Sequence, residues 1–117
     1  MRGVNKAILV GTLGADPISK IFPNGGSYTQ FSIATSEKWQ DKRSGDWMEH
    51  TEWHRIVAHN KTGEIAMKFL KKGSKVYIEG SIHTRQWTDQ SRNHQYITEV
   101  RANHLQVLDG LPAASPV

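Results

Sequence analysis

The stretch TEWHRIVAHNK, residues 51–61, alternates in the way that a β-strand does. One face of the predicted strand carries Trp53, Arg55, Val57 and His59, and the other carries His54, Ile56 and Ala58. Ile56 and Ala58 suit a hydrophobic core. The opposite face instead places an indole, a guanidinium and an imidazole side by side. Such a face on a small protein calls for a functional explanation.

Two more strands are predicted before this stretch. The first is the apolar run VNKAILVGTLG, residues 4–14, and the second covers residues 28–35, which are rich in β-branched and aromatic side chains. The turn signal Asn24-Gly25-Gly26 lies between them. Residues 37–50 are polar, with a Ser-Gly pair at their middle, and predict a long hairpin loop.

A helix and two further strands are predicted after it. Residues 61–74, KTGEIAMKFLKKGS, have apolar side chains at helical spacing, namely Ile65, Ala66, Phe69 and Leu70. We expect Thr62 to cap the start of this helix and Gly73 to mark its end. The last strands are KVYIEGSIHTRQW (75–87), in which Val76, Ile78 and Ile82 share one face, and YITEVRANHLQVL (96–108).

Three strands, one helix and two strands form the chain order of the OB-fold, a five-stranded Greek-key barrel. We therefore expect an all-β domain with one short helix over residues 1–110. Residues 111–117 are small and contain Pro and Ala, without a core pattern, and are expected to be a flexible C-terminal stub.

Composition limits the classes of function. The chain has 117 residues, the usual size of one domain, and a formal net charge of +4, which permits an anionic partner. It has no cysteine, so disulfides and thiolate metal sites are excluded. No apolar run has the length of a signal peptide or a membrane span, so we expect a cytoplasmic protein without a membrane partner.

Patterns for catalysis and for metal binding are missing. The six histidines form no HExxH motif, and His54 and His59 lie on opposite strand faces, so they cannot meet at one metal ion. The acids near the predicted loop are scattered, and Ser36 and Ser44 have no adjacent base. We expect no enzyme activity, no metal and no cofactor.

The strand at residues 75–87 repeats the composition of the opening stretch. His83, Arg85 and Trp87 follow one another at a spacing of two, and Trp39 lies among Lys38, Lys42 and Arg43. Single-stranded nucleic acid explains this arrangement, because bases stack on indoles while arginine and lysine neutralise phosphates. Duplex DNA hides its base faces and offers the tryptophans nothing to stack on.

Each of these features also has a structural explanation. A single tryptophan on a strand is more often a partly buried core or edge residue, and it is the combination of three, two of them paired with arginine, that favours a binding face. Lys71-Lys72 is better explained as a charged helix end, and Gly25-Gly26 as a turn rather than a phosphate cradle.

The sequence resembles the bacterial-type single-stranded-DNA-binding proteins from about Arg2 to about Leu108. The blocks that carry the resemblance are RGVNKAILVGTLGADP, FPNGG, IATSEKW, TEWHRIV, LKKGSKVYIEGSIHTRQWTDQ and YITEV. The resemblance implies an OB-fold that assembles into a homotetramer and wraps single-stranded DNA. Such proteins are not enzymes, and they protect exposed strands in replication, recombination and repair.

The resemblance also implies roles for particular residues. The family's stacking tryptophans match Trp39, Trp53 and Trp87, and its phosphate contacts match Arg2, Lys6, Arg55, Lys61, Lys72 and Arg85. His54 and Tyr77 match subunit-interface positions, and the edge of the first strand matches the pairing surface of a dimer. Residues 1–110 would then serve both DNA binding and oligomerisation.

Three features depart from the family pattern. His59 replaces a phenylalanine; an imidazole still stacks on a base and gains charge below about pH 6.5, so we expect tighter binding in mild acid. Trp47 is an additional aromatic residue, either a fourth stacking platform or a loop-packing residue. The family continues into a long tail whose acidic tip recruits replication and repair proteins. This sequence ends at Val117, as the core of a longer protein or as a shortened relative.

Two other classes of function compete with this interpretation. Replication-restart proteins share the barrel and act as dimeric bridges between partners, but they tend to lack the full set of tryptophans. A nuclease subunit would need clustered carboxylates for metal ions, which the sequence does not offer. The family resemblance also implies a cytoplasmic, nucleoid-associated location in bacteria, or the corresponding place in an organelle.

Overall fold

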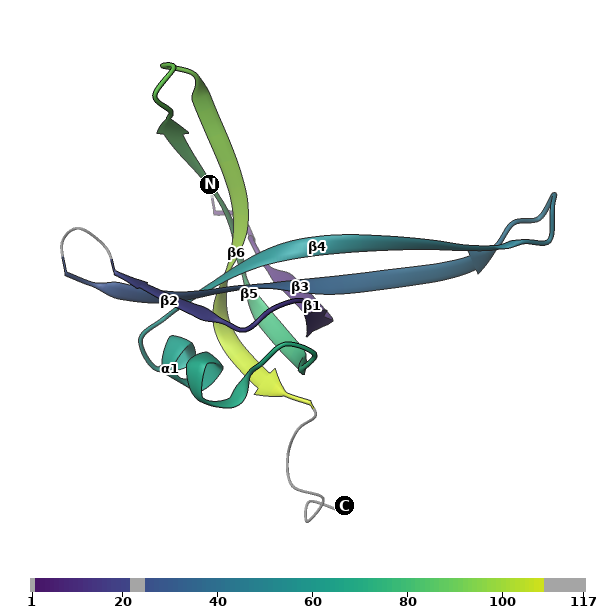
Figure 1. Ribbon diagram of the computed structural model, residues 1–117, viewed down its shortest axis with the longest axis horizontal. Helices are drawn as coiled ribbons and strands as arrows, with labels where there is room; N and C mark the ends of the chain where they lie inside the picture. Colours follow the sequence, from purple (N-terminus) through teal and green to yellow (C-terminus); the bar gives the residue numbers. More distant parts are fainter. Residues whose placement is uncertain (1, 22–24, 109–117) are drawn as a thin grey trace, which may run out of the picture.

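The computed structural model describes residues 2–21 and 25–108 (Figure 1). The elements within these ranges are β1 (Ala7–Leu13), β2 (Ile18–Ile21), β3 (Ser27–Gln40), β4 (Trp47–His59), α1 (Asn60–Phe69), β5 (Lys75–Thr88) and β6 (His94–Val107). The expected stub at residues 111–117 and the turn residue Asn24 lie outside the described ranges.

Five of these strands close into a barrel, which confirms the OB-fold. The sheet order is β1-β5-β6-β4-β3-β2, and a second pairing of β1 with β3, at Thr12↔Ala34 and Leu13↔Ile33, closes the ring. All pairings are antiparallel except β4 with β6, which run parallel. The sequence did not predict β2, a four-residue strand that pairs only with β3 and lies fully exposed.

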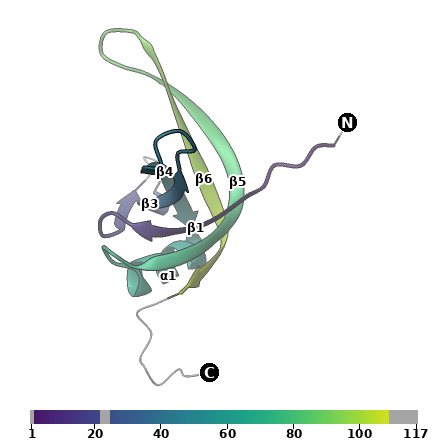
Figure 2. The same cartoon turned by 90° about the vertical axis from the view of Figure 1, so that its right-hand side faces the viewer.

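The core lies inside the barrel and follows the alternation of the strands. Its largest fully buried side chains are Ile33, Ile56, Ile78 and Val76. Each such side chain contributes about 1.5–3 kcal/mol through removal of apolar surface from water. Helix α1 closes one end of the barrel with the buried Ala66, and Figures 1 and 2 show it below the strands, on the side away from the β5–β6 hairpin.

Two long hairpins project from the barrel (Figure 1). We call residues 35–52 of β3 and β4 the β3–β4 arm, and residues 82–98 of β5 and β6 the β5–β6 arm. The predicted loop at residues 37–50 is therefore wrong for most of its length, because β3 and β4 pair without interruption from Tyr28↔His59 to Gln40↔Trp47. Both faces of this ribbon are exposed, so its strands lack the hydrophobic alternation by which a half-buried strand is recognised.

The helix begins earlier than the sequence indicated. It starts at Asn60, directly after β4, so Thr62 lies inside its first turn and does not cap it. Asn60 has a φ of 52°, a left-handed conformation that asparagine tolerates, and this lets the chain turn from strand into helix. The helix ends at Phe69, and Gly73, with a φ of 90°, forms the following turn as expected.

A β-bulge shapes the point where the β5–β6 arm leaves the barrel. The register steps from Glu79↔His104 to Gly80↔Ala102, and a Cβ on Gly80 would collide with the carbonyl oxygen of Arg101. Only glycine permits this close approach of the two backbones. Beyond the bulge the strands diverge from the core, so Ile82 is exposed, whereas Val76 and Ile78 are buried as predicted.

Candidate nucleic-acid interface

The strand registers place several aromatic and basic residues of β3, β4, β5 and β6 on one continuous surface, which we call the outer face. Pairings in β3–β4, β4–β6 and β5–β6 align the outward residues of neighbouring strands. The outer face comprises Tyr28, Trp53, Arg55, Val57, His59, His83, Arg85, Trp87, Glu99 and Arg101. It therefore brings together three of the predicted stacking residues with two of the predicted phosphate contacts.

Trp53 is an exposed platform held against the barrel. Its side chain is 59% exposed, and the ring atoms Cζ3 and Cη2 lie 2.6 and 2.7 Å from where a Cβ of Gly14 would be. Glycine at position 14 therefore allows the indole to rest on the backbone that follows β1. The remaining surface of the ring is open to solvent and available for stacking.

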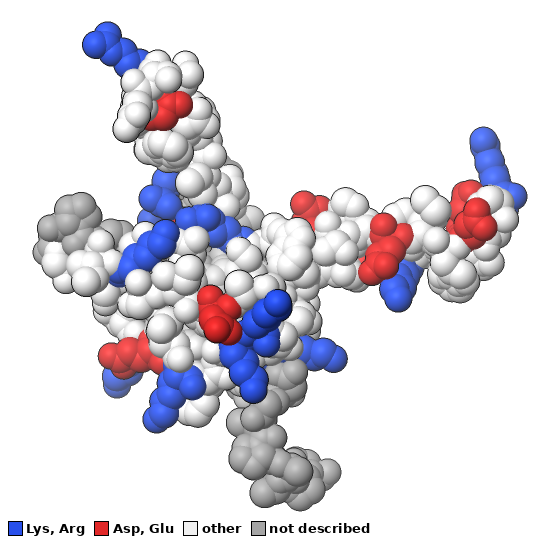
Figure 3. Space-filling model, viewed as in Figure 1, with Lys and Arg blue, Asp and Glu red and all other residues white. Residues whose placement is uncertain are grey.

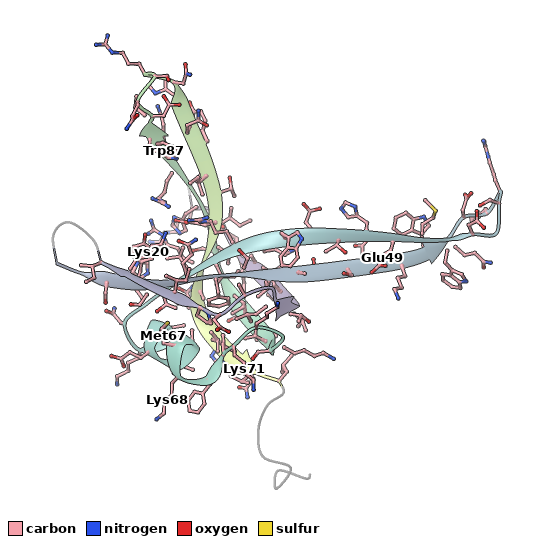
Figure 4. The ribbon with its side chains drawn as sticks, viewed as in Figure 1. Lys20, Glu49, Met67, Lys68, Lys71 and Trp87 are labelled. Atoms are coloured by element: carbon pink, nitrogen blue, oxygen red, sulfur yellow. The ribbon has the colours of Figure 1, made fainter. Side chains whose placement is uncertain are left out.

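Trp87 stands on the β5–β6 arm, opposite Gln95, and is labelled in Figure 4. Trp39 is as exposed as Trp87 but pairs with Met48, and strand alternation puts it on the other face of the β3–β4 arm from Trp53. Trp47 shares the face of Trp53 and is 72% exposed. It lies in β4 rather than in a loop, so of its two interpretations the loop-packing one does not hold.

Arg55 and Arg85 are joined by a buried acid that the sequence analysis did not identify. Glu99 is only 3% exposed; Arg85 Nε donates to its Oε1 at 3.0 Å, and Arg55 Nε lies 3.6 Å from its Oε2. Arg85 is thus anchored through a hydrogen bond from Nε, whereas Arg55 Nε is held only by the ion pair and makes no hydrogen bond within the described residues. The terminal nitrogens of a guanidinium anchored in this way can donate to other partners. The single carboxylate also offsets part of the positive charge of both arginines.

His59 lies beside Tyr28, with ring centroids 6.2 Å apart, and lines two adjoining hollows. The larger has a volume of about 560 Å³ and includes Lys61, His83 and Arg101 in its walls. Arg101 was missed because its segment looks like an ordinary half-buried strand. Lys20 was missed as well; it pairs with Tyr28 from β2 and is labelled in Figure 4.

The other predicted phosphate contacts are spread over the molecule. Lys6 forms an ion pair with Glu79 at 3.5 Å, and the backbone N–H of Lys72 donates to Asp16 at 2.8 Å. Arg2 is exposed ahead of β1. Figure 3 shows the same distribution, with Lys and Arg gathered where the β5–β6 arm meets the barrel and others scattered beyond it. The fold thus groups Arg55, Lys61 and Arg85 and leaves the remaining three apart.

The predicted interface residues occupy two different places. His54 lies where the β3–β4 arm leaves the barrel, and its Nε2 is 2.8 Å from Thr35 Oγ1. Tyr77 lies on the outside of β5 opposite Val10, and its hydroxyl donates to Glu79 at 3.2 Å. Desolvation, followed by the Glu79 carboxylate, raises the pKa of Tyr77. Val10 and Ile8 beside it are exposed apolar residues.

Nothing in the described ranges resembles a metal centre, since no three His, Asp or Glu side chains gather closely enough to hold an ion. The helical part of the described chain is also too short and too polar to cross a membrane. The outer face instead offers flat rings and cations, which suit a polyanion with exposed bases.

Comparison with known proteins also indicates that the chain binds single-stranded nucleic acid. Residues 4–108 match the model of a protein family described as "Single-strand binding protein family". The chain belongs to this family. The resemblance noted from the sequence blocks is thereby confirmed, as is the expectation of a DNA-binding protein rather than an enzyme.

Two solved structures illustrate the likeness to other members of the single-strand binding protein family. A Plasmodium falciparum SSB in complex with single-stranded DNA is 35% identical, with a TM-score of 0.83 over 93% of this chain and 98% of that one. A deletion variant of the single-stranded DNA binding protein from Thermus aquaticus is 29% identical, with a TM-score of 0.77 over 93% of this chain. The present chain spans about half of the Thermus protein, 52%.

Proposed function

We propose that this protein binds single-stranded DNA without regard to sequence and protects it during replication, recombination and repair. The observation that carries the proposal is the outer face, where Trp53, His59 and Trp87 share one surface with Arg55 and Arg85. Stacking on each aromatic side chain contributes about 1–3 kcal/mol per base and accepts any base. The cations bind the phosphates that separate the bases.

We further propose a homotetramer around which the strand wraps. Between residues 7 and 11, β1 pairs with β5 on one edge and has no strand on its other edge within the described chain. Such an edge can pair with a second subunit. The exposed Ile8 and Val10 beside Tyr77 provide an apolar surface for a further contact. Wrapping requires several subunits, because one OB-fold covers only about 4–16 nucleotides.

The location and the partners follow from the ligand. A protein that protects single-stranded DNA acts at the nucleoid in the bacterial cytoplasm, or in the corresponding compartment of an organelle. Replication and repair proteins meet it there.

The decisive experiment is a tryptophan-fluorescence titration with oligo-dT, with a matched duplex as the control, at low and high salt. We expect strong quenching by the single strand alone, and weaker binding at high salt. The variants Trp53→Phe and Trp87→Phe should each remove part of the quenching. Unchanged fluorescence with both ligands would contradict the proposal, because the exposed indoles would then have no base to contact.

The oligomeric state separates this proposal from a protein-bridging module on the same barrel. Sedimentation velocity at micromolar concentration should give the mass of four chains. A dimer that leaves the fluorescence unchanged on adding oligo-dT would favour the bridging function instead. Incubation of a labelled strand with Mg²⁺ should leave it intact, because a family of binding proteins performs no cleavage.

A further inference from the structure

The three arginines of the outer face differ in their ion pairing. Arg55 and Arg85 share the carboxylate of Glu99. Arg101 follows Glu99 by two residues on the same face of β6, yet it forms no ion pair with any Asp or Glu that the structure describes. Glu99 lines the smaller hollow together with Arg101, but its ion pairs are with the other two arginines, so Arg101 has no carboxylate partner of its own in the described chain.

The hollow beside Arg101 is lined by cations and neutral groups. Besides Arg101 its walls include Lys61 and the imidazoles of His59 and His83. The other polar lining residues are neutral: Asn60, Thr62, Ser81 and Asn103. None of the residues that line it is acidic. The first turn of α1 also borders the hollow, and the positive end of the helix dipole adds to the potential there. A space with this lining attracts an anion.

The position of Arg101 is fixed by the sheet. It lies opposite Val57 in the parallel pairing with β4 and opposite Ser81 in the pairing with β5. Its carbonyl group packs against Gly80 at the bulge, where a larger residue would not fit. The backbone at Arg101 is therefore already ordered before a ligand binds, so binding does not have to order it.

We propose that this hollow is a subsite for one backbone phosphate of the bound strand, held by Arg101 and Lys61. The inference rests on the proposed binding of single-stranded DNA and names the residues that hold the backbone at this point. A guanidinium donates two hydrogen bonds to a phosphodiester, and the lysine adds a second charge. Since His59 lines both this hollow and the adjoining one, a base next to that phosphate stacks on its imidazole.

The test compares Arg101→Gln and Lys61→Gln with Lys68→Gln, which removes the same charge from the exposed side of α1 (Figure 4). The ligand is an oligo-dT of about ten nucleotides, short enough for one barrel. Loss of one phosphate contact should reduce the slope of log K against log salt by about 0.7. If the variant and the parent bind equally at 1 M salt, this difference in slope makes the variant bind about eightfold more weakly than the parent at 50 mM salt.

Arg101→Lys keeps the charge and should recover most of the salt slope while remaining weaker than the parent. Circular dichroism spectra and melting curves should coincide for all variants, so that a slope change reports binding. If both hollow variants match Lys68→Gln, the phosphate subsite is refuted while single-strand binding stands. If the parent protein itself fails to bind oligo-dT, the proposed function fails and the subsite falls with it.

Discussion

The indole of Trp53 occupies the space that a side chain at Gly14 would take. A Cβ at position 14 would lie 2.6 Å from Cζ3 of that ring. The backbone there is fixed, because the N–H of Gly14 donates to the carbonyl of Ser32 at 3.2 Å and so ties the end of β1 to β3. A substitution at Gly14 therefore has to displace the indole rather than the strand.

Gly14→Ala should tilt Trp53 away from its resting place and weaken binding of oligo-dT by about five- to thirtyfold, the equivalent of about 1–2 kcal/mol of lost stacking. Gly3→Ala is the matched control, since a Cβ at Gly3 would meet nothing within 4 Å. Fluorescence titration of both variants measures the difference. Equal affinities would show that the contact with Gly14 does not position the ring.

Glu99→Ala should lower the free energy of unfolding by about 1–3 kcal/mol, because it leaves two guanidinium groups beside a void that the carboxylate filled. The loss stays below that of a fully buried pair, since Arg55 and Arg85 are partly exposed and reach water.

Glu52→Ala serves as the comparison for the Glu99 variant. The carboxylate of Glu52 also has a basic partner, because its Oε2 lies 2.8 Å from His50 Nε2, but both side chains are largely exposed. Its removal should change stability by less than about 0.5 kcal/mol. Urea denaturation measures the stability of both variants. If the unfolding midpoints of Glu99→Ala and Glu52→Ala shifted equally, Glu99 would not have a buried, structural role.

The turn of the β3–β4 arm should loosen in acid. The Ser44 hydroxyl, which donates to Asp41 at 2.8 Å, and then the backbone N–H groups of Ser44 and Arg43, lower the pKa of Asp41. A carboxylate whose pKa falls on folding stabilises the folded turn above its ordinary pKa of about 4 and loses that effect as the pH falls through the lowered value. Amide resonances of Arg43 and Ser44 should therefore shift in that acidic range. Asp41→Asn should abolish the titration, and its persistence would identify another group as the cause.

His59 should provide a stacking platform for the bound strand, because its ring lies beside Tyr28 on the outer face. His59→Ala removes the ring and should weaken binding of oligo-dT by about five- to thirtyfold, the equivalent of about 1–2 kcal/mol of lost stacking. His59→Phe keeps a stacking ring and should bind like the parent. Fluorescence titration of the two variants measures the difference, and an unchanged affinity of His59→Ala would show that no base rests on this ring.

The barrel was predictable because its strands are half buried. Val76 and Ile78 alternate with Lys75, Tyr77 and Glu79 in β5, so the period of two is visible in the sequence. In β4 the run Ile56-Val57-Ala58 is buried throughout, and its apolar side chains indicate a core strand. The arms were not predictable in the same way, because neither face of the β3–β4 ribbon is covered. β2 is short and exposed on both sides, and it is ordered only by its pairing with β3.

The candidate interface was predictable in its aromatic part but not in its charges. Trp53 and Trp87 stand out because large rings on polar strand faces are unusual. The ion pairs of Glu99 depend on the parallel contact between β4 and β6, which joins residues 56–58 to residues 100–102 and leaves no local signal in either segment. For the same reason, the lack of an ion pair at Arg101 becomes visible only when the strands are assembled.

The placement of Trp39 and Trp53 on opposite faces of the β3–β4 arm bears on how a bound strand departs. A strand that rests on both indoles of one subunit passes around the edge of the arm, so it cannot lift away along a single direction. It has to peel off from one end, base by base. Another protein that competes for the same strand can then take over the released nucleotides before the rest has dissociated.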